Sequence, residues 1–181
     1  MPRAAGSTAR RRIAERPAPR LWVATPEDAE AVSGLLAAFR DWWGYASPAD
    51  DSIRASVDRL IADPATEFLL GAVDDGPRAD GVVQLRYRHS VWTCSDDAWL
   101  EDLFVRESAR DTGLGRALTE FAFACARRRG CARIQLDVNA GNAPAKALYE
   151  SLGFSAWSES LGADTLFMTR NLQDVRAAAH S

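Results

Sequence analysis

The chain has 181 residues, of which 47% are hydrophobic and 26% are charged, and its net charge at pH 7 is −3. This length fits one domain with an ample core, and the composition is ordinary for a soluble globular protein. No run approaches the roughly 18 apolar residues that span a bilayer, so we expect no membrane partner.

The charge is unevenly distributed along the chain. Residues 1–20 contain six arginines and one acid, Glu15, so the remainder carries a net charge of about −8. We interpret residues 1–19 as a disordered basic leader; a targeting peptide is the alternative, although the apolar segment of a secretion signal is missing. The acidic remainder argues against a nucleic-acid partner and favours a cationic substrate.

Cysteine and histidine are scarce. Cys94, Cys125 and Cys131 lack a paired CxxC spacing, so we expect reduced thiols in a cytoplasmic protein. Only two histidines, His89 and His180, are present, which poorly supplies a zinc site or a Ser-His triad. We therefore expect no metal.

Hydrophobic periodicity and turn residues predict an α/β (α+β) domain over residues 20–172 with a mixed sheet, followed by a flexible tail at 173–181. In chain order, we expect a strand at 21–24, helices from 25 to about 40 and near 52–62, strands at 67–73, 81–92 and 98–105, a helix at 114–129, a strand at 132–138, a helix at 143–152, and strands at 154–157 and 165–170. The first helix opens on Thr25-Pro26-Glu27-Asp28, a hydroxyl cap followed by proline and acids. A helix between the strands at 98–105 and 132–138 implies a parallel pair joined by a crossover.

The most informative string is Arg110-Asp-Thr-Gly-Leu-Gly115, between a predicted strand and a predicted helix. Glycines at a helix start expose free backbone N–H groups, which together with the positive end of the helix dipole form a phosphate or pyrophosphate site. Alone, this signal is weak, because helix entries often contain glycine. A second string, Asn139-Ala-Gly-Asn-Ala-Pro-Ala-Lys-Ala-Leu-Tyr-Glu-Ser-Leu-Gly-Phe154, follows one strand later, and the combination is highly specific.

On these strings the chain resembles the GNAT superfamily of acyl-coenzyme-A-dependent N-acetyltransferases, over about residues 20–170. Arg110-x-x-Gly113-x-Gly115 is similar to that family's pyrophosphate loop, and the string from Asn142 to Phe154 is similar to its second cofactor motif. The resemblance implies a single-domain GNAT fold with a mixed, mostly antiparallel sheet flanked by helices. It also implies that a splayed parallel strand pair binds acetyl-CoA.

The resemblance further implies which residues bind coenzyme A. The pyrophosphate would be held by Arg110 and by the backbone amides of Asp111, Thr112, Gly113, Leu114, Gly115 and Arg116, although both arginines could instead be solvated. The pantetheine arm would pair with the main chain of Leu103, Phe104 and Val105 as an extra strand. Residues 142, 145, 146 and 149 share one helix face, where Asn142 would hydrogen-bond the pantetheine, Ala145 would leave room for it, and Lys146 would reach a phosphate or remain in solvent.

Two residues are predicted to carry out the chemistry. Tyr149 would protonate the departing thiolate of coenzyme A; a core aromatic is the alternative. Glu101 would deprotonate the amine, directly or through a water; its alternative is an ion pair with Arg86 or Arg88. The strand around Glu101 is similar to that of polyamine and diamine acetyltransferases, and Asp102 is expected on its opposite face.

The acceptor site is predicted less sharply. Trp42, Trp43 and Tyr45 lie where this family builds its acceptor wall, and with nearby acids they can hold an ammonium by cation–π and charge contacts. The alternative is that the tryptophans pack on the sheet, while Trp92 and Trp99 are expected in the core or at an interface.

The predicted function is transfer of an acetyl group from acetyl-CoA to a primary amine of a small, cationic substrate by direct attack in a ternary complex. Polyamine-like amines, amino acids, an aminoglycoside and a protein N-terminus all remain open as acceptors. The alternatives are a non-catalytic acyl-CoA-binding regulatory module and a protein N-terminal or lysine acetyltransferase. The usual state of the superfamily implies a homodimer.

Overall fold

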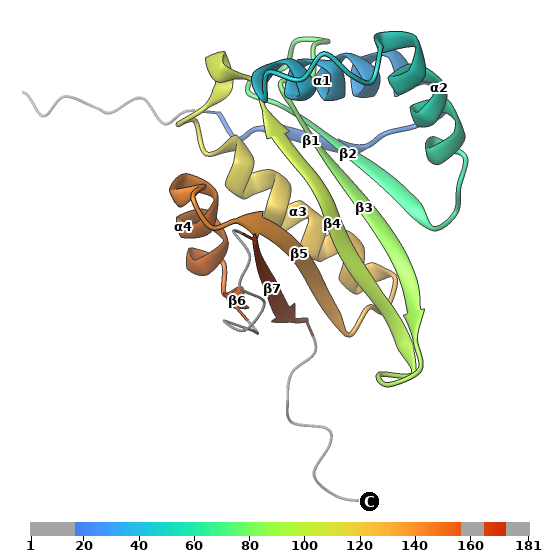
Figure 1. Ribbon diagram of the computed structural model, residues 1–181, viewed down its shortest axis with the longest axis vertical. Helices are drawn as coiled ribbons and strands as arrows, with labels where there is room; N and C mark the ends of the chain where they lie inside the picture. The colour runs from blue at the N-terminus through green and yellow to red at the C-terminus, as the bar shows by residue number, and fades with distance from the viewer. Residues whose placement is uncertain (1–16, 157–164, 173–181) are drawn as a thin grey trace, which may run out of the picture.

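A computed structural model describes residues 17–156 and 165–172, and Figure 1 shows their arrangement. In these ranges a seven-stranded sheet has the order β1-β2-β3-β4-β5-β7-β6. The elements are β1 (Arg20–Val23), η1 (Pro26–Asp28), α1 (Ala29–Trp42), α2 (Asp50–Ile61), β2 (Thr66–Ala72), β3 (Gly81–Ser90), β4 (Ser95–Val105), η2 (Glu107–Ala109), α3 (Leu114–Arg128), β5 (Arg133–Asn139), α4 (Ala143–Ser151), β6 (Ser155–Ala156) and β7 (Thr165–Asn171). The predicted fold class is thereby confirmed.

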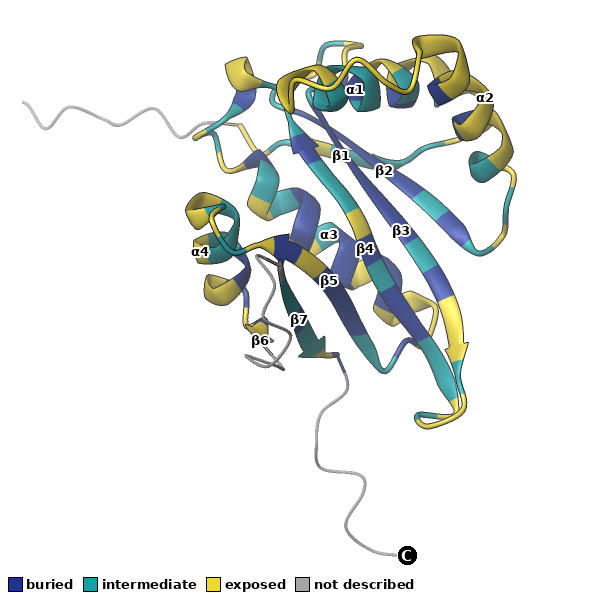
Figure 2. Cartoon of the chain, in the orientation of Figure 1, coloured by how far each residue is buried: buried dark blue, intermediate teal, exposed yellow. Residues whose placement is uncertain are grey.

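The helices cover the two faces of the sheet and create two cores (Figures 1 and 2). Side chains of α1 and α2 pack with alternate residues of the sheet, including Phe68, Val82 and Phe104. The α3 and α4 side buries the intervening positions, such as Leu69 and Val83. This division follows from the alternation of side chains along a strand.

The parallel strand pair is confirmed, and it is short. β4 pairs with β5 at only two positions, Ala98 with Ile134 and Trp99 with Gln135, and every other neighbouring pair in the sheet is antiparallel. Beyond Trp99 the two strands diverge, so the rest of β4 has a free edge towards β5. A free strand edge presents unpaired N–H and C=O groups.

A β-bulge in β4 lies beside this divergence. Leu85 of β3 is opposite Leu100, whereas its neighbour Gln84 is opposite Asp102, so Glu101 is the extra residue in β4. A bulge changes which face the following side chains occupy. Accordingly, Leu100 belongs to the core beneath α3, whereas Phe104, four residues later, belongs to the core beneath α1.

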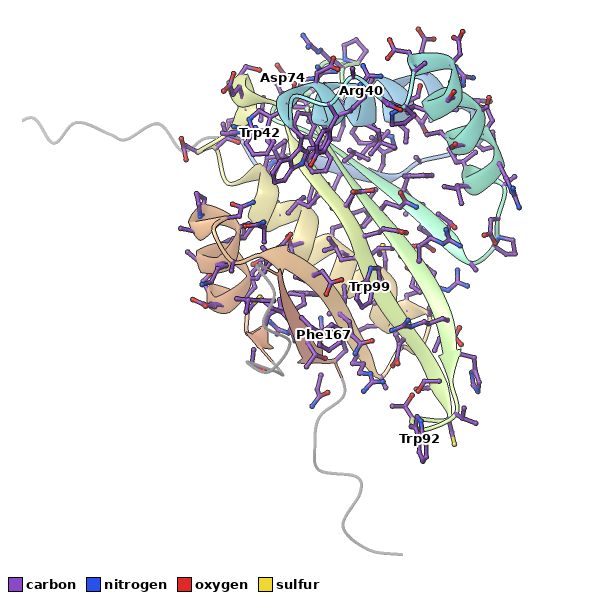
Figure 3. The ribbon with its side chains drawn as sticks, viewed as in Figure 1. Arg40, Trp42, Asp74, Trp92, Trp99 and Phe167 are labelled. Carbon is purple, nitrogen blue, oxygen red and sulfur yellow. The ribbon has the colours of Figure 1, made fainter. Side chains whose placement is uncertain are left out.

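The predicted helix opening is confirmed, because Thr25 and Asp28 form a capping box at η1. Trp92, which we expected in the core or at an interface, is not in the core: it is 94% exposed at the tip of the β3–β4 hairpin (Figure 3). A position at an interface stays a prediction. Trp99 is half-buried and stacks on Phe167 with ring centroids 5.8 Å apart.

The predicted leader and tail lie largely outside the described residues, as does Trp157. Within 17–156 and 165–172, each helix is too short or too polar to span a bilayer.

Candidate active site

A cavity of about 470 Å³ opens where β4 and β5 diverge. Its walls come from the end of α1, β4, the glycine loop, the end of β5 and α4. It brings together thirteen of the predicted site residues: Trp42, Trp43, Glu101, Asp102, Leu103, Phe104, Val105, Arg110, Asp111, Gly115, Asn142, Ala145 and Tyr149. Residues far apart in the sequence therefore line one space, as a cofactor and its acceptor require.

The glycine loop forms one end of this cavity and exposes backbone N–H groups. Asp111 and Gly113 both have positive φ, 59° and 90°, and Gly113 is the N-cap of the 15-residue helix α3. In the described part of the chain, no acceptor is assigned to the N–H groups of Asp111, Thr112, Gly113, Gly115 and Arg116. Successive free amides at a helix N-terminus fit a diphosphate.

The packing around the loop does not require a glycine at position 115. A Cβ at this position would meet the side chains of Leu148 and Val105 at 3.8 Å, which is an ordinary contact distance. Thr112 and Leu114 hold the loop in place: the Thr112 hydroxyl donates to the carbonyl of Ala109, and the Leu114 side chain is buried in the core.

Arg110 and Trp42 lie against each other at the mouth of the cavity. The guanidinium carbon of Arg110 is 4.9 Å from the Trp42 ring centroid, and its Nε donates to the carbonyl oxygen of Val105 over 3.2 Å. Trp42 therefore lies towards the glycine loop, although the sequence places it only in the acceptor wall.

Six predicted residues are not among those that line this cavity, and three of them, Thr112, Gly113 and Leu114, belong to the glycine loop just described. Arg116 donates to the Ser151 hydroxyl over 2.6 Å and lies 3.7 Å from Glu120, so it connects α3 with α4. Lys146 and Tyr45 also lie outside the lining. A phosphate-binding role for Arg116 and Lys146 stays a prediction.

Asn142, the N-cap of α4, and Tyr149 both line the cavity, as expected of residues predicted to share one helix face. The Asn142 Oδ1 accepts from the backbone N–H of Ala145 over 3.2 Å and caps the helix, which leaves its amide N–H groups for a ligand. Tyr149 is only 6% exposed, and its ring packs against Phe154. Burial and then the charge of Asp102 raise the pKa of Tyr149, so its phenol stays protonated and able to donate.

Glu101 is exposed to the cavity and held by one neighbour. The Gln84 Nε2 donates to its carboxylate over 3.3 Å. The alternative ion pairs with Arg86 and Arg88 are not found in the described residues, where Arg86 lies 3.8 Å from Asp63 and Arg88 donates to Gln135.

Asp102 lines the same cavity as Glu101, so the expectation that it lies on the opposite face is wrong. The bulge at Glu101 is the reason, because it interrupts the alternation of β4. Burial first, and the neighbouring charge of Glu101 second, raise the pKa of Asp102 to about 6. Two carboxylates thus meet where the predicted thioester chemistry would occur.

Sequence reasoning missed several lining residues. Phe39 of α1 and the end of β5, including Asp137 and Asn139, contribute to the cavity. The β5 positions directly precede the second cofactor motif, which is a signal that could have identified them. Within the described ranges, no group of three or more His, Cys, Asp or Glu side chains is placed to hold a metal ion.

Comparisons with known proteins agree with this geometry. Residues 34–154 match the Acetyltransferase (GNAT) family. The mycothiol acetyltransferase of Beutenbergia cavernae is 42% identical over 108 residues, 58% of this chain and 33% of that protein. The [ribosomal protein bS18]-alanine N-acetyltransferase of Escherichia coli is 47% identical over 60 residues, 33% of this chain and 40% of that protein.

A solved structure shows the same fold. It is AAC(6')-Iy in complex with the bisubstrate analogue CoA-S-monomethyl-acetylneamine, with a TM-score of 0.68 and 21% identity, covering 81% of this chain and 97% of that one. The matches to the two curated relatives span only a third to two fifths of their lengths. Since the family match covers two thirds of the sequence, the chain belongs to the GNAT family of acetyltransferases.

Proposed function

We propose that this protein transfers an acetyl group from acetyl-CoA to a primary amine in a ternary complex. One observation carries the proposal: the diverging strands β4 and β5 open a single cavity with free helix-start amides at one end and Glu101 and Tyr149 further along it.

Coenzyme A would bind by main-chain contacts. The amides from Asp111 to Arg116 would hold its pyrophosphate at the start of α3, and Arg110 would add a positive charge. The free edge of β4 at Leu103–Val105 would pair with the amide-bearing pantetheine arm, as an added strand does. Among the described residues this edge has no neighbouring strand, because pairing with β5 stops at Trp99. Arg110, whose Nε donates to the Val105 carbonyl, would have to release that oxygen for the arm.

The chemistry would then need three proton transfers. An ammonium has no lone pair, so Glu101 would first remove a proton from the amine, directly or through a water. The amine nitrogen attacks the thioester carbon and the C–N bond forms; the nitrogen of the tetrahedral intermediate then loses its extra proton to solvent, and the C–S bond breaks as the intermediate collapses. Tyr149 would donate its phenolic proton to the departing thiolate, giving free coenzyme A and the amide.

Turnover distinguishes this enzyme from an acyl-CoA-binding module. We expect thiol release from acetyl-CoA that depends on an added amine and is lowered by both Glu101→Gln and Tyr149→Phe. Binding of acetyl-CoA without thiol release would favour the module. Unchanged rates in both variants would refute the two catalytic assignments.

A protein N-terminus is the second candidate acceptor. The similarity to a protein named as a ribosomal-protein-alanine acetyltransferase supports it, although that match covers only 60 residues. A peptide with an N-terminal alanine, compared with a small amine in the same assay, tests this alternative. We also propose a homodimer in the cytoplasm with a folded domain over residues 20–172; light scattering tests the dimer.

A further inference from the structure

A second cavity, of about 280 Å³, lies between α1, α2 and the sheet. It shares Phe39, Trp43 and Asp102 with the cavity at the diverging strands, so the two spaces meet at these three residues. Tyr45 lines only this second cavity. The aromatic residues predicted from the sequence therefore divide between the two spaces, with Trp42 on the cofactor side, Trp43 at the junction and Tyr45 beyond it.

The walls of the second cavity are mainly apolar. They include Leu36, Phe39, Pro48, Ile53, Val57 and Leu60. Phe39 stacks on Phe104 at 5.2 Å and also packs against Trp43 at 6.1 Å, so the junction is aromatic. A volume near 300 Å³ is at the lower end of the range for small-molecule sites, which suits a body of about one ring.

Most polar side chains in this cavity already have partners. Arg40 donates to Asp41, to Asp50 and to the carbonyl of Pro48, with N–O distances of 2.6 to 2.9 Å, so its charge is compensated by two carboxylates. Ser56 donates to the carbonyl of Ser52, and Gln84 donates to Glu101.

Asp102 is different. In the described part of the chain its carboxylate has no assigned hydrogen bond and no cationic partner, and its strand neighbour is a second acid, Glu101. Among the described residues that line the second cavity, Asp102 is thus the one charged side chain without a partner of opposite charge. A half-buried carboxylate in this state favours a cation, which the acceptor can supply.

We propose that the second cavity is the acceptor subsite and that the acceptor is a primary amine carried on an aromatic or branched aliphatic group. The ammonium is held at Asp102, and the apolar body lies between α1 and α2. This inference rests on the proposed acetyl transfer and names its substrate class. A polyhydroxylated or polycationic amine fits less well, because its further polar groups would face Ile53, Val57 and Leu60 without partners.

An amine panel tests the substrate class. With saturating acetyl-CoA, we would measure thiol release with 2-phenylethylamine, 3-methylbutylamine, ethanolamine, spermidine, an aminoglycoside and a peptide starting with alanine. We expect kcat/KM for the two apolar amines to exceed that for ethanolamine by about tenfold or more, since each added methylene in an apolar pocket gives that order of discrimination. A higher kcat/KM for spermidine, the aminoglycoside or the peptide than for 2-phenylethylamine would overturn the inference.

Single-residue variants test which side chains produce the preference for apolar amines. Tyr45 is 63% exposed, so Tyr45→Ser is expected to fold and to lower the preference for 2-phenylethylamine over ethanolamine several-fold. Asp102→Asn is expected to raise KM for both amines alike and to leave acetyl-CoA affinity unchanged. The control is Trp92→Ala, at the 94% exposed hairpin tip, which should change neither quantity. An unchanged preference in Tyr45→Ser would place the apolar body elsewhere and refute the subsite.

Binding separates this inference from the proposed function. Calorimetry would measure 2-phenylethylamine and spermidine binding to the protein saturated with coenzyme A. Preferential binding of 2-phenylethylamine without any turnover would refute acetyl transfer and support the subsite. Turnover with equal or better binding of spermidine would support acetyl transfer and refute the apolar class.

Discussion

Replacing Asp102 by asparagine is expected to stabilise the fold at neutral pH. Burial and the charge of Glu101 raise the pKa of Asp102 from 3.8 to about 6. Each pKa unit corresponds to 1.36 kcal/mol, so the ionised carboxylate destabilises the folded state by about 3 kcal/mol. Asparagine has nearly the same size and no charge, and it removes this penalty.

The pH dependence follows from the direction of the shift. The folded protein holds this proton more tightly than the unfolded chain, so wild-type stability falls as pH rises from about 4 to above 6. The excess stability of Asp102→Asn is therefore absent below about pH 4, about half developed at pH 5 and complete at pH 8. Glu101 and Tyr149 line the first cavity with Asp102, Arg40 lines the second with it, and all three are present in both proteins.

Urea unfolding at pH 5 and pH 8 measures this difference. Asp75→Asn, in the exposed β2–β3 turn, is the matched control and is expected to show no comparable gain. An Asp102→Asn variant no more stable than wild type at pH 8, or one whose advantage is larger at pH 5, would refute the reasoning.

Three further predictions concern the proposed cofactor end of the site. Tyr149→Phe is expected to lower kcat about 100-fold with acetyl-CoA affinity retained; stopped-flow thiol detection measures it, and an unchanged kcat would remove Tyr149 as the acid. Gly113→Ala should lower the stability by about 1 to 2 kcal/mol and weaken acetyl-CoA binding, because the φ of Gly113 is +90°. Gly115→Ala should be tolerated, because the nearest atoms to the added Cβ would be 3.8 Å away. Thermal melts and calorimetry measure both variants, and equal effects would contradict the loop geometry. Asn142→Ala should lower the stability by about 1 kcal/mol, because it removes the helix cap. Asn142→Asp should keep the cap and lower only the affinity for acetyl-CoA. Equal acetyl-CoA affinity in the Asn142→Asp variant and the wild type would exclude a donor role for the Asn142 amide.

Local signals in the sequence predicted most of the elements. Thr25 with Pro26 marks the first helix start, and Gly113 marks the start of α3, because capping and left-handed turns depend on residues close in sequence. The parallel pair also followed from the sequence, since a helix between two strands requires a crossover. These features needed no knowledge of distant contacts.

The bulge at Glu101 could not be predicted in the same way. It is defined by pairing between Gln84 and Asp102 on different strands, and alternation along β4 alone places Asp102 on the wrong face. The division of the aromatic residues after α1 was not predicted either. Trp42 lines the first cavity and Tyr45 the second, and this depends on how α1 and α2 pack on the sheet, which local sequence does not determine.

The same stretch of β4 leaves two kinds of group unsatisfied. Among the described residues its edge has no strand partner beyond Trp99, and Asp102 has no cationic partner. Longer pairing with β5 would remove the first deficit, and a neutral side chain would remove the second. A stretch that is destabilised in two independent ways is expected where a ligand provides the missing interactions. On this view coenzyme A would complete the backbone edge and the amine would complete the charge. Each substrate should then stabilise the protein against unfolding separately, and both together should do so by about the sum of the two effects.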